Sequence, residues 1–302
     1  MTSQFQRIGI IGRHDDPRVS GHMQALVRHL NAIPVAVFAA ESLDLDLALN
    51  RVPEQELASQ VDLIIAIGGD GTMLYACGLA GRQNVPLLGV NRGRLGFLAD
   101  IIPDEMLNSV DRVLAGDFTR ESRLMLTTTL ERADGSRTQA EALNDIVLQR
   151  RETGRMVDFE TRVDGRYVNT HAGDGLIVAT PTGSTAYSLS CGGPIIEPGL
   201  DAVVVVPICP HTLTDRPIVM PADQPIDINM LERDGTKAEV TADGRSIGDI
   251  HAGDRLRICR SERRAILIHP PGYDYYEILR SKLYWGRDLR TRVTSGEGSA
   301  EC

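Results

Sequence analysis

The fold is decided by the stretch Leu63-Ile64-Ile65-Ala66-Ile67-Gly68-Gly69-Asp70-Gly71-Thr72. Its five apolar residues predict a buried parallel strand, and its glycines predict a loop that opens a helix over residues 72–77. Glycines let backbone N–H groups approach a ligand, and a helix N-terminus favours phosphate. Asp70 lies inside this cradle, so we interpret it as a carboxylate for proton abstraction or metal binding. The alternative is an ordinary turn, because Asp-Gly is a common turn dipeptide.

Strand and helix signals alternate along the first third of the chain. Short apolar runs predict strands at residues 8–11, 34–38 and 86–90, beside the strand at 63–67. Apolar residues at helical spacing predict one helix over residues 19–30, and Pro103 opens another that ends near Gly116. This alternation predicts an α/β N-terminal domain over residues 1–120. It has a parallel doubly wound sheet, with the ligand at the carboxyl ends of the strands.

The pattern changes over residues 121–271. Short β-rich runs are separated by Asp-Gly pairs at 134–135, 164–165, 234–235 and 243–244, which are typical of hairpin turns. We therefore predict a β-rich, mostly antiparallel C-terminal domain there. A helix at about residues 272–290 is expected to pack back on the first domain. The small polar residues 291–302 predict a disordered tail.

Composition excludes several classes of function. The 302 residues carry a net charge of −9, from 32 basic and 41 acidic residues, which argues against non-specific nucleic-acid binding. The five cysteines are scattered and never in C-x-x-C spacing, so we expect neither a disulfide framework nor a zinc site. We see no signal peptide and no apolar run long enough to span a bilayer. These features predict a cytoplasmic protein without a membrane or nucleic-acid partner.

Two further segments follow or precede predicted strands. Asn91-Arg92-Gly93-Arg94-Leu95-Gly96-Phe97-Leu98 follows the strand at 86–90, so it is expected at the same sheet edge as the glycine-rich loop. Taken by itself, it favours a connector that needs glycine for a tight turn. Asn144-Asp145 places an amide beside a carboxylate, a pair that can grip vicinal hydroxyls. By itself, strand-end turn chemistry is the better interpretation of that pair.

The densest polar segment covers residues 174–194. A β-run, Asp174-Gly175-Leu176-Ile177-Val178-Ala179, leads into Thr180-Pro181-Thr182-Gly183-Ser184-Thr185-Ala186-Tyr187-Ser188-Leu189-Ser190. Hydroxyl-rich loops at a helix start can bind a nucleotide, but they can equally serve as helix caps. The length of this loop beside a buried strand favours binding.

Together these segments resemble the NAD kinase family. Residues 68–71 match its GGDG phosphate loop, 91–98 its N-x-G-x-L-G-F-L element, and 144–145 its N-E/D pair. Residues 174–194 follow D-G-L-I-x-x-T-P-T-G-S-T-A-Y-S-L-S-x-G-G-P. GGDG alone also occurs in diacylglycerol kinases, sphingosine kinases and phosphofructokinases, so the specific evidence is the block at 180–194. The resemblance runs from about residue 8 to residue 285.

The resemblance implies transfer of a phosphoryl group from ATP to the 2′-hydroxyl of the adenosine ribose of NAD, giving NADP. It implies that Asp70 is the general base and that Gly71 helps to hold the nucleotide phosphates. Asn144 and Asp145 would bind the adenosine side. Asp174 would contact the nicotinamide-riboside end or a neighbouring subunit's ligand. Further implied ligand contacts are Arg155, Thr185, Ala186, Tyr187, Ser188, Leu189 and Ser190.

The resemblance also implies a divalent cation, Mg²⁺, held mostly by the phosphates with carboxylate help, and assembly as dimers or tetramers. Two residues depart from the family pattern. Ala172 stands where some relatives carry arginine or another polar residue, and Arg245 stands where others carry glutamine. These two departures leave open whether the phosphoryl donor is ATP alone or polyphosphate as well.

Two rival functions differ in their requirements. A lipid or sugar kinase with the same GGDG loop needs an apolar acceptor pocket or sugar-phosphate-binding arginines, and the hydroxyl-rich loop suits neither. A non-catalytic NAD(H)-binding regulator needs no base, so the presence of Asp70 argues against it.

Overall fold

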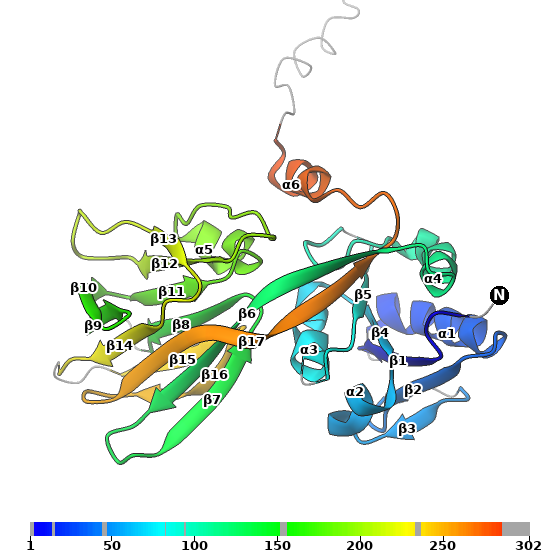
Figure 1. The fold of residues 1–302 in the computed structure, drawn as a ribbon, viewed down its shortest axis with the longest axis horizontal. Coiled ribbons are helices and arrows are strands. Elements are labelled where there is room, and N and C mark those ends of the chain that lie inside the picture. Colours follow the sequence, from blue (N-terminus) through cyan, green and yellow to red (C-terminus); the bar gives the residue numbers. More distant parts are fainter. Residues whose placement is uncertain are drawn as a thin grey trace, which may run out of the picture.

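The computed structural model describes residues 3–13, 16–43, 47–81, 83–93, 95–151, 156–232 and 237–285. Two lobes are joined by two long strands, β6 (Thr119–Glu131) and β17 (Arg255–His269) (Figure 1). The N-terminal lobe contains β1 (Arg7–Gly12), α1 (Pro17–Asn31), β2 (Ala36–Ala40), β3 (Asn50–Val52), α2 (Leu57–Gln60), β4 (Leu63–Ile67), α3 (Asp70–Ala80), β5 (Leu87–Val90) and α4 (Met106–Leu114), with 3-10 turns η1 (Glu54–Glu56) and η2 (Pro103–Glu105).

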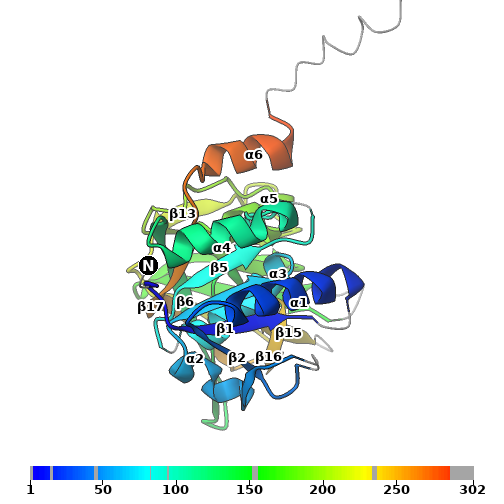
Figure 2. The same ribbon diagram turned by 90° about the vertical axis from the view of Figure 1, so that its right-hand side faces the viewer.

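The sheet of the N-terminal lobe is parallel and doubly wound, as predicted. Its strands lie in the order β3-β2-β1-β4-β5, and each neighbouring pair is parallel. Helices α1 and α4 lie side by side against one face of the sheet (Figure 2). The other face is covered by α2 and α3. In such a sheet the carboxyl ends of β1 and β4 frame the expected binding crevice.

Strand β4 forms the centre of this lobe. Its five residues have no exposed surface. Leu63, Ile65 and Ile67 belong to the core under α1 and α4, whereas Ile64 and Ala66 belong to the core under α2 and α3. A strand buried on both faces needs this continuous apolar run, because alternate side chains point to opposite sides. The prediction of a buried parallel strand is confirmed.

One predicted strand is displaced. Strand β2 begins at Ala36 rather than at Pro34. The backbone N–H groups of Ile33 and Val35 instead donate to Leu30 and Ile33 in the turn that ends α1. Because proline has no N–H to donate to a strand ladder, the turn extends past Pro34 before pairing begins.

The C-terminal lobe is a β-sandwich, and the prediction of a mostly antiparallel domain is confirmed. One layer, in the order β13-β12-β11-β8-β15-β16, has only antiparallel pairs among the described residues. The other contains β10, β9 and β14 beside β17 and β6, and an apolar core lies between the layers. Its further elements are β7 (Arg137–Ala142), β8 (Asp145–Arg150), β9 (Val157–Val163), β10 (Arg166–Gly173), β11 (Gly175–Ala179), η3 (Gly183–Thr185), α5 (Tyr187–Ser190), β12 (Ala202–Ile208), β13 (Ile218–Pro221), β14 (Ile226–Met230), β15 (Ala238–Ala242) and β16 (Arg245–Ile250).

Three of the four predicted Asp-Gly hairpins are present. They connect β6 to β7, β9 to β10 and β15 to β16, each pair antiparallel. In the last two, aspartate and glycine both have positive φ, at 50° and 73° for Asp164 and Gly165 and at 48° and 74° for Asp243 and Gly244. Two-residue hairpin turns of type I′ require this conformation. The fourth pair, at residues 234–235, lies outside the described residues.

Strand β17 makes one continuous sheet of parts of both lobes. Its first residues pair with β14, and Leu267 and Ile268 pair in parallel with β5. It also pairs with β6 on both sides of an irregularity between Arg260 and Arg264. The domain boundaries at residues 120 and 271 stay predictions, and they fall close to the start of β6 and the end of β17. Helix α6 (Tyr275–Leu283) follows, capped by Asp274. Its packing on the first domain also stays a prediction, and the predicted tail at 291–302 lies outside the described residues.

The central strand offers a test of the fold. Ile65→Ala should lower the free energy of unfolding by about 2–5 kcal/mol, because truncating a fully buried side chain leaves a cavity. Leu213→Ala is the control, since Leu213 is 90% exposed, and it should change stability by less than about 0.5 kcal/mol. Urea unfolding of both variants measures the difference. Equal losses would contradict the placement of β4 in the core.

Candidate functional site

The first part of the site is the turn from β4 into α3. The Gly68 N–H donates to the Val90 carbonyl at 2.8 Å, and the Gly69 carbonyl accepts from the N–H groups of Thr72 and Met73. A Cβ on Gly68 would lie 2.1 Å from the Thr72 hydroxyl oxygen, so only glycine fits there. Asp70 is therefore the first residue of α3, at the carboxyl end of the central strand.

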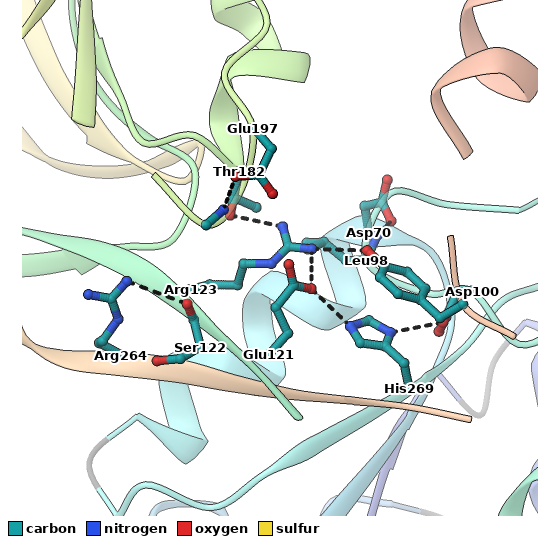
Figure 3. A network of polar contacts seen from close by, with 12 residues as sticks. Asp70, Leu98, Asp100, Glu121, Ser122, Arg123, Thr182, Glu197, Arg264 and His269 are labelled. Atoms are coloured by element: carbon teal, nitrogen blue, oxygen red, sulfur yellow. Dashed lines mark hydrogen bonds and ion pairs between the residues drawn. The ribbon is translucent and has the colours of Figure 1, made fainter. Parts of the chain in front are cut away.

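Two backbone N–H groups hold the Asp70 carboxylate. Phe97 donates to Oδ2 at 3.1 Å. Leu98, which lies beside Asp70 in Figure 3, donates to Oδ1 at 3.0 Å. The Gly96 N–H closes the same turn on the Ala99 carbonyl at 2.9 Å. A carboxylate can accept about four hydrogen bonds, so Asp70 is oriented with acceptor capacity left over. The described residues of this segment, 91–93 and 95–98, thus meet the glycine-rich loop at one sheet edge, as predicted.

A cavity of about 480 Å³ opens at the N-terminus of α3, lined by Gly69, Gly71, Thr72, Tyr75 and Arg92, with Ile11, Gly12 and Arg13. The guanidinium of Arg92 is held by Asp16, with Nη1 2.9 Å from Oδ2. Hydrogen bonds from Arg18 and Arg92 hold the pKa of Asp16 far below its usual range. Arginine side chains and a helix N-terminus together suit an anionic ligand such as a phosphate chain.

A second cavity, of about 290 Å³, brings four of the predicted contact residues together. Asn144, Asp145, Ala186 and Tyr187 line it, beside Leu74 of α3 and Gly244. Two segments far apart in sequence, at 144–145 and 186–187, therefore meet at one concave surface between the lobes.

Asp243 fixes the Asn144-Asp145 turn. Its carboxylate accepts from the backbone N–H groups of Leu143, Asn144 and Asp145, at 2.8, 2.7 and 3.2 Å. On the other side, the Asn144 carbonyl accepts from the Thr180 N–H at 2.9 Å. The sequence interpretation missed this role, because Asp243-Gly244 reads simply as a hairpin turn.

The carboxyl group of Asp145 has an unusual environment. Its residue is only 6% exposed. Burial, and then the charge of Asp243, raise the pKa of Asp145 to about 7. Burial also raises the pKa of Asp243. A buried carboxyl that titrates near neutrality, at the wall of a cavity, is typical of a functional site.

The hydroxyl-rich segment divides into buried and accessible residues. Thr180 donates to the Leu143 carbonyl, Ser184 donates to Pro181 and accepts from the Ile196 N–H, and Ser188 has no exposed surface. These hydroxyl groups belong to the interior of the loop. The predicted contact residues with exposed surface are Thr185, Ala186, Tyr187, Leu189 and Ser190.

The remaining predicted contacts lie elsewhere. Asp174 forms an ion pair with Arg150, whose Nε lies 2.6 Å from Oδ1. Ala172 is in β10, where its carbonyl accepts from the His211 N–H. The guanidinium carbon of Arg245 lies 5.0 Å from the centre of the Tyr75 ring, a cation–π contact between the lobes. Arg155 lies outside the described residues.

A buried group of charged side chains was missed entirely by the sequence interpretation. Asp100, Glu121, Arg123 and His269 form a continuous polar network close to Asp70 (Figure 3). The signal that could have found it is Glu121-Ser122-Arg123, which places two opposite charges on one face of the strand, directly before the apolar residues 124–126.

Across the described ranges, no group of three or more His, Cys, Asp or Glu side chains is placed to hold a metal ion. Within the same part of the chain, none of the helices combines the length and the apolar character that crossing a membrane requires.

Family models and curated relatives match the chain over most of its length. The ATP-NAD kinase N-terminal domain matches residues 8–118, and the ATP-NAD kinase C-terminal domain matches residues 143–270. The NAD kinase of Nitrosococcus oceani is 40% identical over 296 residues, covering 96% of this chain and all of the relative. That of Azotobacter vinelandii is 42% identical over 288 residues, covering 94% and 98%.

Two solved structures share the fold. Yeast NADH kinase complexed with NADH has a TM-score of 0.87 at 26% identity, covering 94% of this chain and 89% of that chain. An NAD kinase from Archaeoglobus fulgidus in complex with ATP has a TM-score of 0.71 at 27% identity, covering 91% and 99%.

Glycine at position 96 is required by the position of Asp70. A Cβ there would lie 2.3 Å from Asp70 Oδ1, so Gly96→Ala should displace the carboxylate and lower the free energy of unfolding by about 1–3 kcal/mol. Gly78→Ala is the matched control in α3, because nothing lies within 4 Å of its Cβ, and it should raise stability by up to about 1 kcal/mol. Urea unfolding compares them. A Gly96→Ala protein as stable as the wild type would contradict the hydrogen-bonded turn.

The raised pKa of Asp145 predicts a pH-dependent stability. The folded state keeps this proton up to about pH 7, whereas an unfolded aspartate releases it near pH 3.9, so burial of Asp145 destabilises the protein increasingly between those values. Asp145→Asn should therefore gain stability relative to the wild type as the pH rises from about 4 to about 7. Urea unfolding at both ends of that range measures the change. A difference between the two proteins that is the same at each pH would refute the buried-carboxyl interpretation.

Proposed function

The chain belongs to the ATP-NAD kinase family and phosphorylates NAD, and we propose that Asp70 is the general base of this transfer. The reaction moves the terminal phosphoryl group of ATP to the 2′-hydroxyl of the adenosine ribose of NAD. The observation that carries the proposal is the pair of hydrogen bonds from Phe97 and Leu98, which orient the Asp70 carboxylate at the start of α3.

A ribose hydroxyl is a weak nucleophile at neutral pH. As its oxygen forms a bond to the terminal phosphorus of ATP, the bond from that phosphorus to the ADP oxygen breaks, and the hydroxyl proton passes to Asp70. A positioned base of this kind contributes roughly 10²–10⁴-fold to the rate. The rest of the acceleration comes from alignment of the two substrates and from neutralisation of the phosphate charge.

The phosphate chain of ATP is proposed to lie in the cavity at the N-terminus of α3. Gly71 leaves open space there, since nothing lies within 4 Å of a Cβ at that position, and Arg92 supplies positive charge at the cavity wall. The Archaeoglobus fulgidus relative in complex with ATP supports this donor. Mg²⁺ is proposed to arrive as part of the MgATP substrate, which fits a chain whose described residues form no metal-ligand cluster.

The dinucleotide acceptor is proposed to bind in the second cavity. Asn144 and Asp145 offer amide and carboxyl groups to ribose hydroxyls, and Tyr187 offers an aromatic ring to the adenine. Yeast NADH kinase, complexed with NADH, supports a dinucleotide ligand on this fold. Further contacts proposed from the family resemblance are Arg155, Ala172, Asp174, Thr185, Ser188, Leu189, Ser190 and Arg245.

The cellular context is proposed from the sequence. The four cysteines in the described part of the chain are free thiols, which suits the reducing cytoplasm. The net charge of −9 opposes nucleic-acid binding. Assembly as a homodimer or homotetramer is proposed from the family resemblance.

Asp70→Asn tests the assignment of the base. The amide cannot take up the hydroxyl proton, so kcat for NADP formation with ATP and Mg²⁺ should fall roughly 10²–10⁴-fold. The amide nitrogen also cannot accept from an N–H, so one of the two backbone hydrogen bonds is lost, at a cost of about 0.5–1.5 kcal/mol of stability.

The control is Asp117→Asn, which changes an exposed carboxylate paired with Arg112. It should leave kcat unchanged. Wild-type turnover by a folded Asp70→Asn protein, measured in a coupled assay of NADP formation, would remove Asp70 from the mechanism.

A further inference from the structure

A line of charged side chains crosses from one lobe to the other (Figure 3). His269, at the end of β17, has Nδ1 2.9 Å from Asp100 Oδ2 and Nε2 3.1 Å from Glu121 Oε2. The same Glu121 oxygen accepts from Arg123 Nη2 at 2.7 Å. Arg123 Nη1 donates to the Thr182 hydroxyl at 3.2 Å. The line therefore runs from the loop after β5, through β17 and β6, to the hydroxyl-rich loop.

The charges in this line balance in one protonation state. Arg123 and His269 are 2% and 1% exposed, so water screens them little. Ionised carboxylates only accept hydrogen bonds, and both ring nitrogens of His269 face carboxylate oxygens, so both nitrogens must donate. The doubly protonated imidazolium and Arg123 then offset Asp100 and Glu121. Loss of the imidazolium proton leaves one buried negative charge without a partner.

Other ionisable groups complete the surroundings. The Tyr273 ring stacks on His269 at 3.7 Å between centroids, and its hydroxyl accepts from Arg123 Nη2 at 3.2 Å. Tyr275, the first residue of α6, and Cys77 of α3 lie within electrostatic range of Arg123. Glu197 lies within electrostatic range of Tyr275.

The two ends of the line lie on the two loops that the transfer uses. Asp100 follows Leu98 by two residues, in the turn whose N–H groups hold Asp70. That turn is tied to β5 by the Ile101 N–H, which donates to the Gly89 carbonyl at 3.2 Å. At the other end, Thr182 immediately precedes η3 and the residues that line the acceptor cavity. A shift of one loop against the other would move the base away from the acceptor.

We propose that Asp100, His269, Glu121 and Arg123 are positioning residues, which hold the Asp70 turn and the acceptor loop at a fixed separation while His269 is doubly protonated. This proposal rests on the proposed function of Asp70. Its physical reason is that base and acceptor are on different lobes, and a misplacement of about 1 Å can cost roughly 10²-fold in rate.

The positioning should be lost at alkaline pH. Burial alone would lower the pKa of His269, but hydrogen bonds to Asp100 and Glu121 outweigh burial and raise it above its ordinary value. The imidazolium is thus present below this raised pKa, and it disappears as the pH rises through it. We expect kcat to decline over the same pH range, and the KM for NAD to change little, because the acceptor side chains are untouched.

Glu121→Gln tests the proposal, because the amide keeps the shape and can still accept from Arg123 while removing one carboxylate from His269. Measured from about pH 6 to about pH 10, the alkaline midpoint of kcat should move down by roughly 1–2 pH units relative to the wild type. Asp100→Asn should shift it in the same direction. NMR titration of the wild-type His269 ring, assigned by its missing signal in His269→Asn, should give a pKa above about 6.5.

Glu160→Gln is the matched control, since Glu160 is a partly exposed carboxylate that pairs with Arg162 on β9, and its midpoint should equal that of the wild type. The proposal is overturned if the midpoints of Glu121→Gln and Asp100→Asn equal the wild-type value, or if His269 titrates at or below about pH 6.5 in the wild type. If Asp70→Asn retains full turnover, the proposed function of Asp70 fails instead. The NMR titration of the wild type measures the charge of His269 independently of the effect of any variant on kcat.

Discussion

Two backbone N–H groups, those of Phe97 and Leu98, determine where the Asp70 carboxylate lies. These two N–H groups belong to a tight turn that is hydrogen-bonded to β5. The accepting carboxylate is that of Asp70, the first residue of α3, which starts just after β4 ends. Main-chain donors cannot change rotamer, so the carboxylate is oriented before any substrate arrives. The same contact explains why position 96 holds glycine, since a Cβ there would lie 2.3 Å from the carboxylate.

The two-lobe architecture imposes a second constraint. The cavity at the start of α3 is lined by the N-terminal lobe alone, whereas the acceptor cavity is lined by the C-terminal lobe and by Leu74 of α3. Phosphoryl transfer between ligands in these two cavities would need the lobes at a fixed separation. The pairing of β6 with β17, the Arg245–Tyr75 contact and the buried line from Asp100 to Thr182 each hold the lobes together. Of these, only the buried line contains a histidine side chain, whose positive charge is lost as the pH rises through its raised pKa.

Local patterns predicted the parts of the fold that depend on local sequence. The apolar run at 63–67, the glycines after it and the Asp-Gly turns determine a strand, a helix start and hairpins, and the structure has all three. The sequence could not show which way the hydroxyls of Ser184 and Ser188 point, because direction depends on tertiary packing around Ile196 and Gly193. It also missed Asp243 and the Asp100–His269 pair. His269 is 169 residues from Asp100 in sequence, and only strand pairing brings them together.

The central claim, that Asp70 removes the proton from the adenosine ribose, is tested most directly by a crystal structure of this protein with NAD bound. The account predicts that one Asp70 carboxylate oxygen lies about 2.6–3.2 Å from the 2′-hydroxyl oxygen of that ribose. It also predicts that the Phe97 and Leu98 N–H groups still donate to the carboxylate. A bound NAD whose 2′-hydroxyl faces another residue, with Asp70 out of hydrogen-bonding range, would contradict it.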